Sequence, residues 1–286
     1  MQEDGWTCPD EQIFSFDNSQ SFRFYRLHFT ACGSDNYIEL YQLEYFNFGL
    51  GSLKVDVPSN VSQTNDLLSL CGQLRLVKDG AGDFTIAEPG QTYSGGTIIS
   101  NGTLIAGIAG DDAPLGIFNE SDGDASCVTI CSNGTFDVNG FCGWWRYPVR
   151  LAGGTLACRM AQDVAPEATF RNIVLDADSS LVVSGNFIMG DGSGEEGILD
   201  LGGHVLTASV SRDGLWTFNM PLLTAGTIAF NLDRADAYAD KKVMSWEPGE
   251  RPADVSFVQA NGGHYAVAAR GDGVYAVGRG MAIILR

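Results

Sequence analysis

Two runs of alternating hydrophobic and polar residues lie near the start of the chain. Residues 22–30 (FRFYRLHFT) and 37–46 (YIELYQLEYF) both follow the period of a β-strand, in which every second side chain faces the same way. The turn-forming stretch 32–36 (CGSDN) separates them. This pattern predicts an antiparallel strand pair within residues 1–50, where it forms an N-terminal cap.

The pattern changes from about residue 51 to residue 238. Short aliphatic runs alternate with Gly, Asn and Asp, and a turn followed by a small residue and an apolar one recurs. The five steps from the copy at residue 102 to the copy at residue 226 average about 25 residues, which is one coil of a β-solenoid. The clear copies are 101–104 (NGTL), 133–136 (NGTF) and 153–156 (GGTL), and degenerate copies begin at Ser179, Gly197 and Gly226.

Two heptapeptides within this region resemble each other. Residues 134–140 (GTFDVNG) align with residues 197–203 (GILDLGG), and each places an aspartate, Asp137 or Asp200, between apolar residues. Both end in a dipeptide that tolerates positive φ. We therefore predict that these segments turn a corner of the coil.

The last segment, residues 239–286, has a different pattern. The sequence Arg270-Gly271-Asp272-Gly273 lies between two alternating runs and predicts a hairpin. Residues 282–285 (AIIL) predict a buried strand. Because an open solenoid end exposes strand edges, we expect a small antiparallel β cap here.

Composition narrows the class of protein. The formal net charge is −18, which disfavours nucleic-acid binding and anionic membrane surfaces. Glycine supplies 36 of 286 residues, which argues against a helical bundle. No apolar stretch is long enough to span a bilayer, and no leader-like segment follows Met1, so a piece of a longer protein is expected. We also expect a monomer.

One stretch resembles a known family. In residues 90–107, the motifs Thr92-Tyr93-Ser94-Gly95-Gly96-Thr97 and Asn101-Gly102-Thr103-Leu104 are similar to the autotransporter-associated β-strand repeat. The resemblance implies an all-β protein whose central part is a right-handed parallel β-helix. It also implies a passenger domain that is extracellular or on a bacterial cell surface.

Two weaker resemblances concern the ends. Residues 21–46 resemble the last strands of a discoidin-like β-sandwich, of which this chain would hold only a truncated segment. The tail, with its Gly-Val-Tyr-Ala-Val and Ile-Ile-Leu-Arg sequences, resembles the terminal cap of large bacterial surface β-helix proteins. Neither resemblance assigns a ligand-binding residue here.

The aromatic segment around Trp144 is the best candidate contact site. Neighbouring strand residues face opposite sides, so one of Trp144 and Trp145 is expected to be exposed. Together with Tyr147, it would stack on the face of a sugar from a surface glycan or an extracellular polysaccharide. The alternative is that this cluster packs a loop against the solenoid.

Other candidates favour a structural role. Several acidic groups lack the neighbouring basic residues of a lyase, so we interpret them as carboxylates of turns, with calcium binding as a weaker alternative. These groups lie at residues 111–112, 120–124, 176–178, 191 and 195–196. The Arg270-Gly271-Asp272 tripeptide is explained by the hairpin. The seven cysteines suggest buried thiols or one or two disulfides, and neither a metal site nor a cofactor is expected.

These observations favour a non-enzymatic bacterial surface or secreted module that acts as a passenger, stalk or adhesin. The alternatives are a carbohydrate-binding module and a polysaccharide lyase or glycosidase of β-helix type. An enzyme of this kind would align a pair of carboxylates on adjacent coils.

Overall fold

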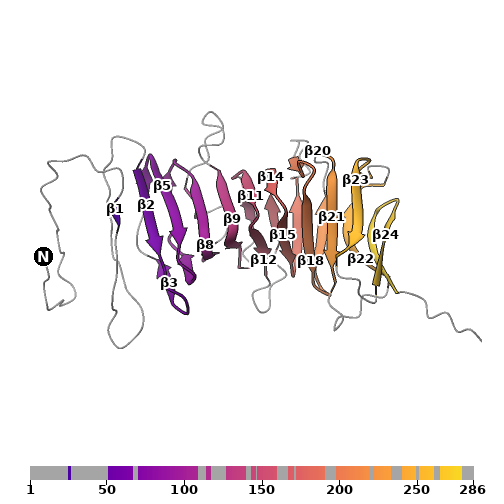
Figure 1. Cartoon of the computed structure of the whole chain (residues 1–286), viewed down its shortest axis with the longest axis horizontal. Coiled ribbons are helices and arrows are strands. Elements are labelled where there is room, and N and C mark those ends of the chain that lie inside the picture. The colour runs from indigo at the N-terminus through magenta and orange to yellow at the C-terminus, as the bar shows by residue number, and fades with distance from the viewer. Residues whose placement is uncertain are drawn as a thin grey trace, which may run out of the picture.

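The computed structural model describes residues 25–26, 51–66, 70–108, 114–116, 127–139, 143–145, 147–159, 167–170, 172–190, 198–218, 222–232, 240–248, 251–260 and 265–278. Every regular element in these ranges is a β-strand. The strands lie side by side along the long axis of the molecule, in the order of the chain (Figure 1). Almost all of them pair in parallel, so the predicted all-β parallel solenoid is confirmed.

The coil has three faces, which we number in the order in which the chain passes through them. On the first face each strand pairs in parallel with its neighbour one coil away, and β1 (Tyr25–Arg26) pairs with the first of them. The strands are β2 (Gly51–Asp56), β5 (Leu74–Asp79), the first halves of β8 (Thr97–Ala106) and β9 (Val128–Asp137), β11 (Val149–Ala152), β14 (Asn172–Ala177), β17 (Ile198–Asp200) and β20 (Leu222–Leu223).

The second face follows after a corner, and the long strands β8 and β9 run through that corner to join both faces into one sixteen-stranded sheet. Its pairing is parallel throughout. The strands are β3 (Ser62–Asn65), β6 (Asp83–Ile86), the second halves of β8 and β9, β12 (Thr155–Cys158), β15 (Ser179–Val183), β18 (Val205–Val210), β21 (Gly226–Asn231) and β23 (Val255–Gln259).

The third face begins with a separate two-stranded sheet and continues as a seven-stranded one. Pairing is parallel until the last two strands, which form a hairpin and pair antiparallel. The strands are β4 (Cys71–Gly72) with β7 (Thr92–Tyr93), then β10 (Gly143–Trp145), β13 (Glu167–Phe170), β16 (Asn186–Met189), β19 (Leu215–Phe218), β22 (Lys241–Trp246), β25 (Gly273–Gly278) and β24 (Tyr265–Arg270).

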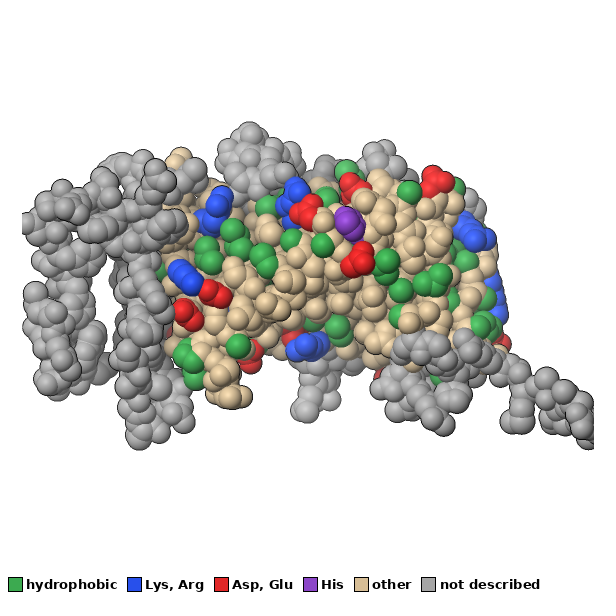
Figure 2. Space-filling model, in the orientation of Figure 1, with side chains coloured by type: hydrophobic (Ala, Val, Ile, Leu, Met, Phe, Trp, Pro, Cys, Tyr) green, Lys and Arg blue, Asp and Glu red, His purple; other side chains and the backbone are tan. Residues whose placement is uncertain are grey.

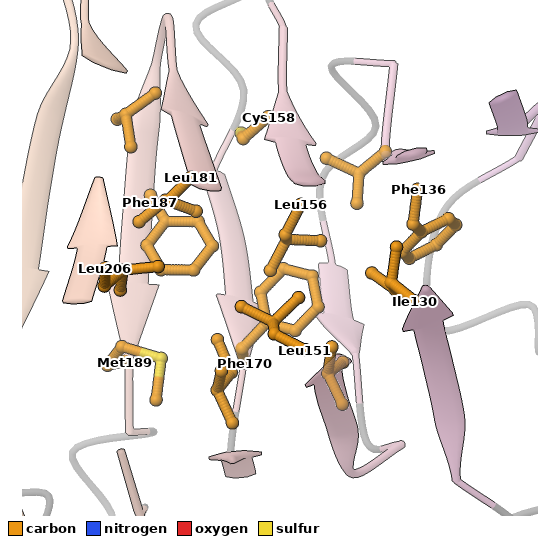
Figure 3. Close-up of a cluster of buried hydrophobic side chains, with 14 of the residues drawn as sticks. Ile130, Phe136, Leu151, Leu156, Cys158, Phe170, Leu181, Phe187, Met189 and Leu206 are labelled. Carbon is orange, nitrogen blue, oxygen red and sulfur yellow. The ribbon is translucent and has the colours of Figure 1, made fainter. Parts of the chain in front are cut away.

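Columns of stacked side chains fill the interior. Because parallel strands pair in register, the inward residue of one coil lies against the inward residue of the next. Side chains from several coils meet in the close-up of the core, where Phe136, Leu156 and Leu181 are in view (Figure 3). The second-face column consists of Phe84, Leu104, Phe136, Leu156, Leu181, Ala208 and Phe230, each at most 8% exposed.

The predicted repeat stacks in register over its first four copies. Asn101 lies beside Asn133, and Thr135 beside Thr155, which in turn lies beside Ser180. The last two copies were assigned wrongly. The segment after Gly197 belongs to β17 on the first face. The predicted alignment placed Gly226 in register with Ser179. In the structure Ser179 pairs with Leu206, and Leu206 pairs with Ile228, two residues after Gly226.

The two similar heptapeptides do turn corners, and they do so in the same way. The Asp137 side chain accepts a hydrogen bond from the Asn139 amide at 2.9 Å, and Asp200 accepts one from the Gly202 amide at 2.9 Å. Asn139 has φ 51° and Gly202 has φ 54°. The two corners nevertheless follow strands on different faces, β9 on the second and β17 on the first.

The structure describes different amounts of the two predicted caps. The predicted antiparallel pair of residues 22–30 and 37–46 lies outside the described residues apart from β1, so the discoidin-like cap of residues 1–50 stays a prediction. Parallel pairing continues past residue 238 through β22 and β23, because these strands carry the same alternating pattern as the coils before them. The hairpin around Gly271 is confirmed, whereas residues 282–285 lie outside the described residues.

Candidate functional site

The two tryptophans of the candidate site belong to β10, the first strand of the seven-stranded sheet. The register places Trp145 beside Phe170 and Trp144 beside Thr169. The positions that continue the Trp145 column along the coil are buried: Phe170, Met189, Phe218 and Trp246. The side chains of Trp144 and Trp145 themselves lie outside the described part of the chain, so their exposure stays a prediction.

The positions that continue the Trp144 column have a different character. Thr169 is followed along the axis by Ile188, Thr217 and Ser245, and all four are partly exposed. The Ser245 hydroxyl donates to the Thr217 hydroxyl at 3.3 Å. This column forms an uncharged outer strip of hydroxyl and aliphatic groups, which can donate and accept hydrogen bonds.

Tyr147 occupies an interior position. Its side chain is only 5% exposed, and its hydroxyl donates to the carbonyl of Gly116 at 2.9 Å. It lies near Tyr93, whose hydroxyl is 2.6 Å from the Thr97 hydroxyl and whose pKa is raised by burial. A buried ring with a bonded hydroxyl contributes to the core and offers little surface to a sugar.

The described acidic residues of the candidate groups are paired. Arg150 donates to both carboxylate oxygens of Asp176, at 2.7 and 3.0 Å. Asp178 accepts from the Val205 amide at 2.9 Å and lies 3.6 Å from His204 Nδ1. Figure 2 shows acidic and basic side chains next to each other on the displayed face, with small groups of hydrophobic side chains between them. The groups at 111–112, 120–124, 191 and 195–196 lie outside the described residues.

The Arg-Gly-Asp tripeptide uses its charged side chains within the hairpin. Arg270 donates to Asp240 at 3.0 Å, and its guanidinium lies 4.2 Å from the centre of the Tyr275 ring. Asp272 accepts from Lys242 and from the Tyr275 hydroxyl, and these hydrogen bonds lower its pKa. Both charged side chains therefore have partners within the molecule. This is consistent with the prediction that the tripeptide serves the hairpin.

Cysteines and metal ligands give no site within the described ranges. Cys71, Cys127 and Cys131 are free thiols, and the side chains of Cys127 and Cys158 are buried. Among the residues that the structure describes, no group of three or more His, Cys, Asp or Glu side chains could hold a metal ion. Cys8, Cys32 and Cys142 lie outside those residues, so disulfide formation by them stays a prediction.

The sequence did not lead us to predict that two charged side chains, those of Asp137 and Lys78, are buried. Asp137, 5% exposed, lies 3.0 Å from Arg159, and burial raises its pKa. Lys78 is completely buried, and its ammonium donates to the carbonyls of Asp79, Gly80 and Asn101 at 2.9, 2.8 and 3.0 Å. The strand pattern could have revealed Lys78, because it shares the inward parity of Leu74 and Leu76.

Comparison with known proteins identifies one segment. Residues 76–106 match the family model of the passenger-associated transport repeat. The match runs from β5 to β8, where Leu76 and Thr97 lie one coil apart, and it overlaps the stretch at 90–107 that resembled such a repeat. No curated protein matches the chain.

The repeat and the solenoid together support a passenger β-helix of autotransporter type, and with it an extracellular or cell-surface location. Within the described ranges, no helix is long and apolar enough to cross a membrane.

Proposed function

We propose that this chain is a non-enzymatic, rigid stalk within a bacterial surface or secreted passenger. The observation that carries the proposal is the register of the second face, which continues from β6 to β23 with every adjacent pair parallel. Such a ladder resists bending, because each coil is bonded to its neighbours along the axis. The passenger-associated repeat lies within this ladder.

Two carboxylates of the described ranges are bonded within the molecule, which supports the proposal that the chain is non-enzymatic. A glycosidase needs two carboxyl groups about 5 to 9.5 Å apart and facing one sugar. Here Asp176 is bonded to Arg150, and Asp137 to Arg159 and the Asn139 amide. Incubation of the purified protein with a panel of polysaccharides should release no reducing ends and no unsaturated products. Release of either product, lost in an Asp137→Asn or Asp176→Asn variant, would establish an enzyme instead.

The strip on the third face suggests how the stalk would contact a glycan. Trp144 shares its register position with the partly exposed Thr169, and an exposed indole next to hydroxyl groups suits the face and the edge of a sugar. A glycan array, read with calcium and again with EDTA, tests this adhesin role. We expect a Trp144→Ala variant to lose binding, and a Val258→Ala variant on the second face to keep it. No binding by the unaltered protein would leave the stalk without an adhesin role.

A further inference from the structure

The Asn101–Gly102 peptide of β8 has an unusual local geometry. The Gly102 amide donates to the Oδ1 atom of the preceding Asn101 side chain at 2.9 Å. Gly102 has φ 70°, and a Cβ atom on it would lie 2.4 Å from the carbonyl oxygens of Gly80 and Gly82. The residue must therefore be glycine, and its backbone nitrogen is held beside the side-chain carboxamide of Asn101.

A buried cation contacts the same peptide group. The Lys78 ammonium donates to the Asn101 carbonyl at 3.0 Å, and this carbonyl belongs to the amide whose nitrogen is that of Gly102. A charged donor on a carbonyl oxygen stabilises negative charge there, as in an oxyanion hole. Since Lys78 is shielded from water, its ammonium favours loss of the Gly102 amide proton more strongly than solvent would.

We propose that Asn101–Gly102 is a self-modification site at which Lys78 promotes succinimide formation. A solvent base removes the Gly102 amide proton, and the nitrogen attacks Cγ of Asn101. The new N–Cγ bond closes a five-membered ring, the Cγ–Nδ2 bond breaks, and the Nδ2 group takes up a proton from the solvent and departs as ammonia. Water then opens the ring at either carbonyl, which yields aspartate or isoaspartate. The net reaction consumes one water and releases one ammonia for each asparagine.

The product changes the corner next to Lys78. Either form places a new carboxylate close to the ammonium, and isoaspartate adds one methylene to the backbone of β8. Asn101 is paired in register with Asn133 of β9, so this change lies within the ladder. In the unmodified corner the Lys78 ammonium is bonded to backbone carbonyls. After the modification it would form an ion pair with the new carboxylate of residue 101.

The next coil supplies an internal comparison with the same local sequence. Residues 100–103 and 132–135 have the identical sequence Ser-Asn-Gly-Thr, and Asn101 and Gly102 stack directly on Asn133 and Gly134. The position that corresponds to Lys78 in the next coil is Ile99. A Cβ atom on Gly134 would meet the Ile99 side chain, whereas one on Gly102 would meet the Lys78 ammonium. The two sites share their local sequence and differ in the cation and in the glycine conformation, since φ is positive at Gly102 but not at Gly134. The Lys78→Met variant therefore separates the effect of the cation from that of the backbone.

The experiment is peptide mapping by mass spectrometry after incubation of the folded, full-length chain in water enriched in oxygen-18. Enzymatic methylation identifies the isoaspartate fraction. We expect Asn101 to convert at least about ten-fold faster than Asn133, although Asn133 is the more exposed of the two. A Lys78→Met variant should lose this difference, and an Asn101→Gln variant should incorporate no label at residue 101.

A denatured sample separates the effect of the fold from that of sequence. In concentrated denaturant the identical tetrapeptides should convert at equal rates, and a Lys78→Met variant that failed to fold would show the same equality together with a lost circular dichroism spectrum. Equal rates at Asn101 and Asn133 in the folded protein would overturn the proposal. A difference that persists in folded Lys78→Met protein would also overturn it.

Discussion

Lys78 shows how a single residue can hold a corner of the coil. Its aliphatic stem takes the inward position that Val55 and Ile99 occupy in the neighbouring coils, and its three donors are all used by backbone carbonyls. Burial lowers its pKa to about 8, although Asp79, Asp83 and Asp56 act in the opposite direction. The charged form is thus less favourable in the folded chain than in the unfolded one.

This shift predicts a pH dependence of stability. Between pH 8 and pH 10.5 the unfolded chain holds a proton on Lys78 that the folded chain has lost, so the free energy of unfolding should rise with pH in this window. Denaturant unfolding at several pH values, compared with Lys78→Met, isolates the contribution. The wild-type value should increase relative to the variant from pH 8 to pH 10.5; parallel curves would show that Lys78 titrates normally.

A second prediction at this scale concerns glycine. Gly102→Ala adds a Cβ atom against two carbonyl oxygens in a left-handed conformation, and we expect a loss of about 3 kcal/mol or more. Gly203 also has positive φ, at 81°, but a Cβ atom there would have nothing within 4 Å. Gly203→Ala should therefore cost only about 1 to 2 kcal/mol. Urea unfolding of both variants gives the comparison, and equal losses would rule out the close approach at Gly102.

At the scale of strands, the sequence predicted that the elements are β-strands better than it predicted the face of the coil to which each strand belongs. The turn-Gly-Thr-apolar pattern predicted the column through Asn101 and Asn133, because the repeated dipeptide takes the same register position in successive coils. It misplaced the copy at Gly197, since the Asp-containing corner recurs after strands on two different faces. Coil length also varies: Leu104 pairs with Phe136, 32 residues on, and Phe136 with Leu156, 20 residues on. A fixed period therefore cannot assign a strand to a face.

The ligand-binding role of Trp144, Trp145 and Tyr147 stays a prediction. Trp144 and Trp145 lie on a strand, as expected. Tyr147 is buried, and its hydroxyl donates to the Gly116 carbonyl. Burial of Lys78 and Asp137 depends on contacts with residues one coil away or in the next corner, such as Asn101 and Arg159. The alternation of β5 does place Lys78 on the inward side, but local sequence does not identify the partners of either charge.

The aromatic column of the third face predicts the energetics of a strand. Phe187 is fully buried between Phe170, 5.3 Å away between ring centroids, and Trp216, 5.9 Å away. Phe187→Ala should lower the free energy of unfolding by about 3 to 5 kcal/mol. Ile188→Ala, on the outer side of the same strand, should cost at most about 1 kcal/mol. Similar losses in the two variants, measured by urea unfolding, would contradict the assigned inner and outer sides of β16.

The whole molecule is a ladder whose length follows from its register. The described strands succeed one another along the long axis (Figure 1), and parallel pairing extends to β23 before the antiparallel hairpin of β24 and β25. Ion pairs such as Lys54–Asp79 and Arg150–Asp176 connect neighbouring coils on the outside. An acidic rod of this kind suits a stalk exposed to solvent, and its rigidity is the property on which the proposed function depends.

The most direct test of the ladder is a distance measured along it. Thr103 and Val258 are six register steps apart on the second face, through Thr135, Thr155, Ser180, Thr207 and Ala229. At about 4.8 Å per step, their backbones should lie about 29 Å apart. Spin labels introduced at both positions through a non-natural amino acid, so that the seven native cysteines remain unlabelled, would report this distance by pulsed electron resonance. A single narrow peak near that value is the result we predict. A broad distribution, or a peak far from it, would contradict the rigid in-register stalk.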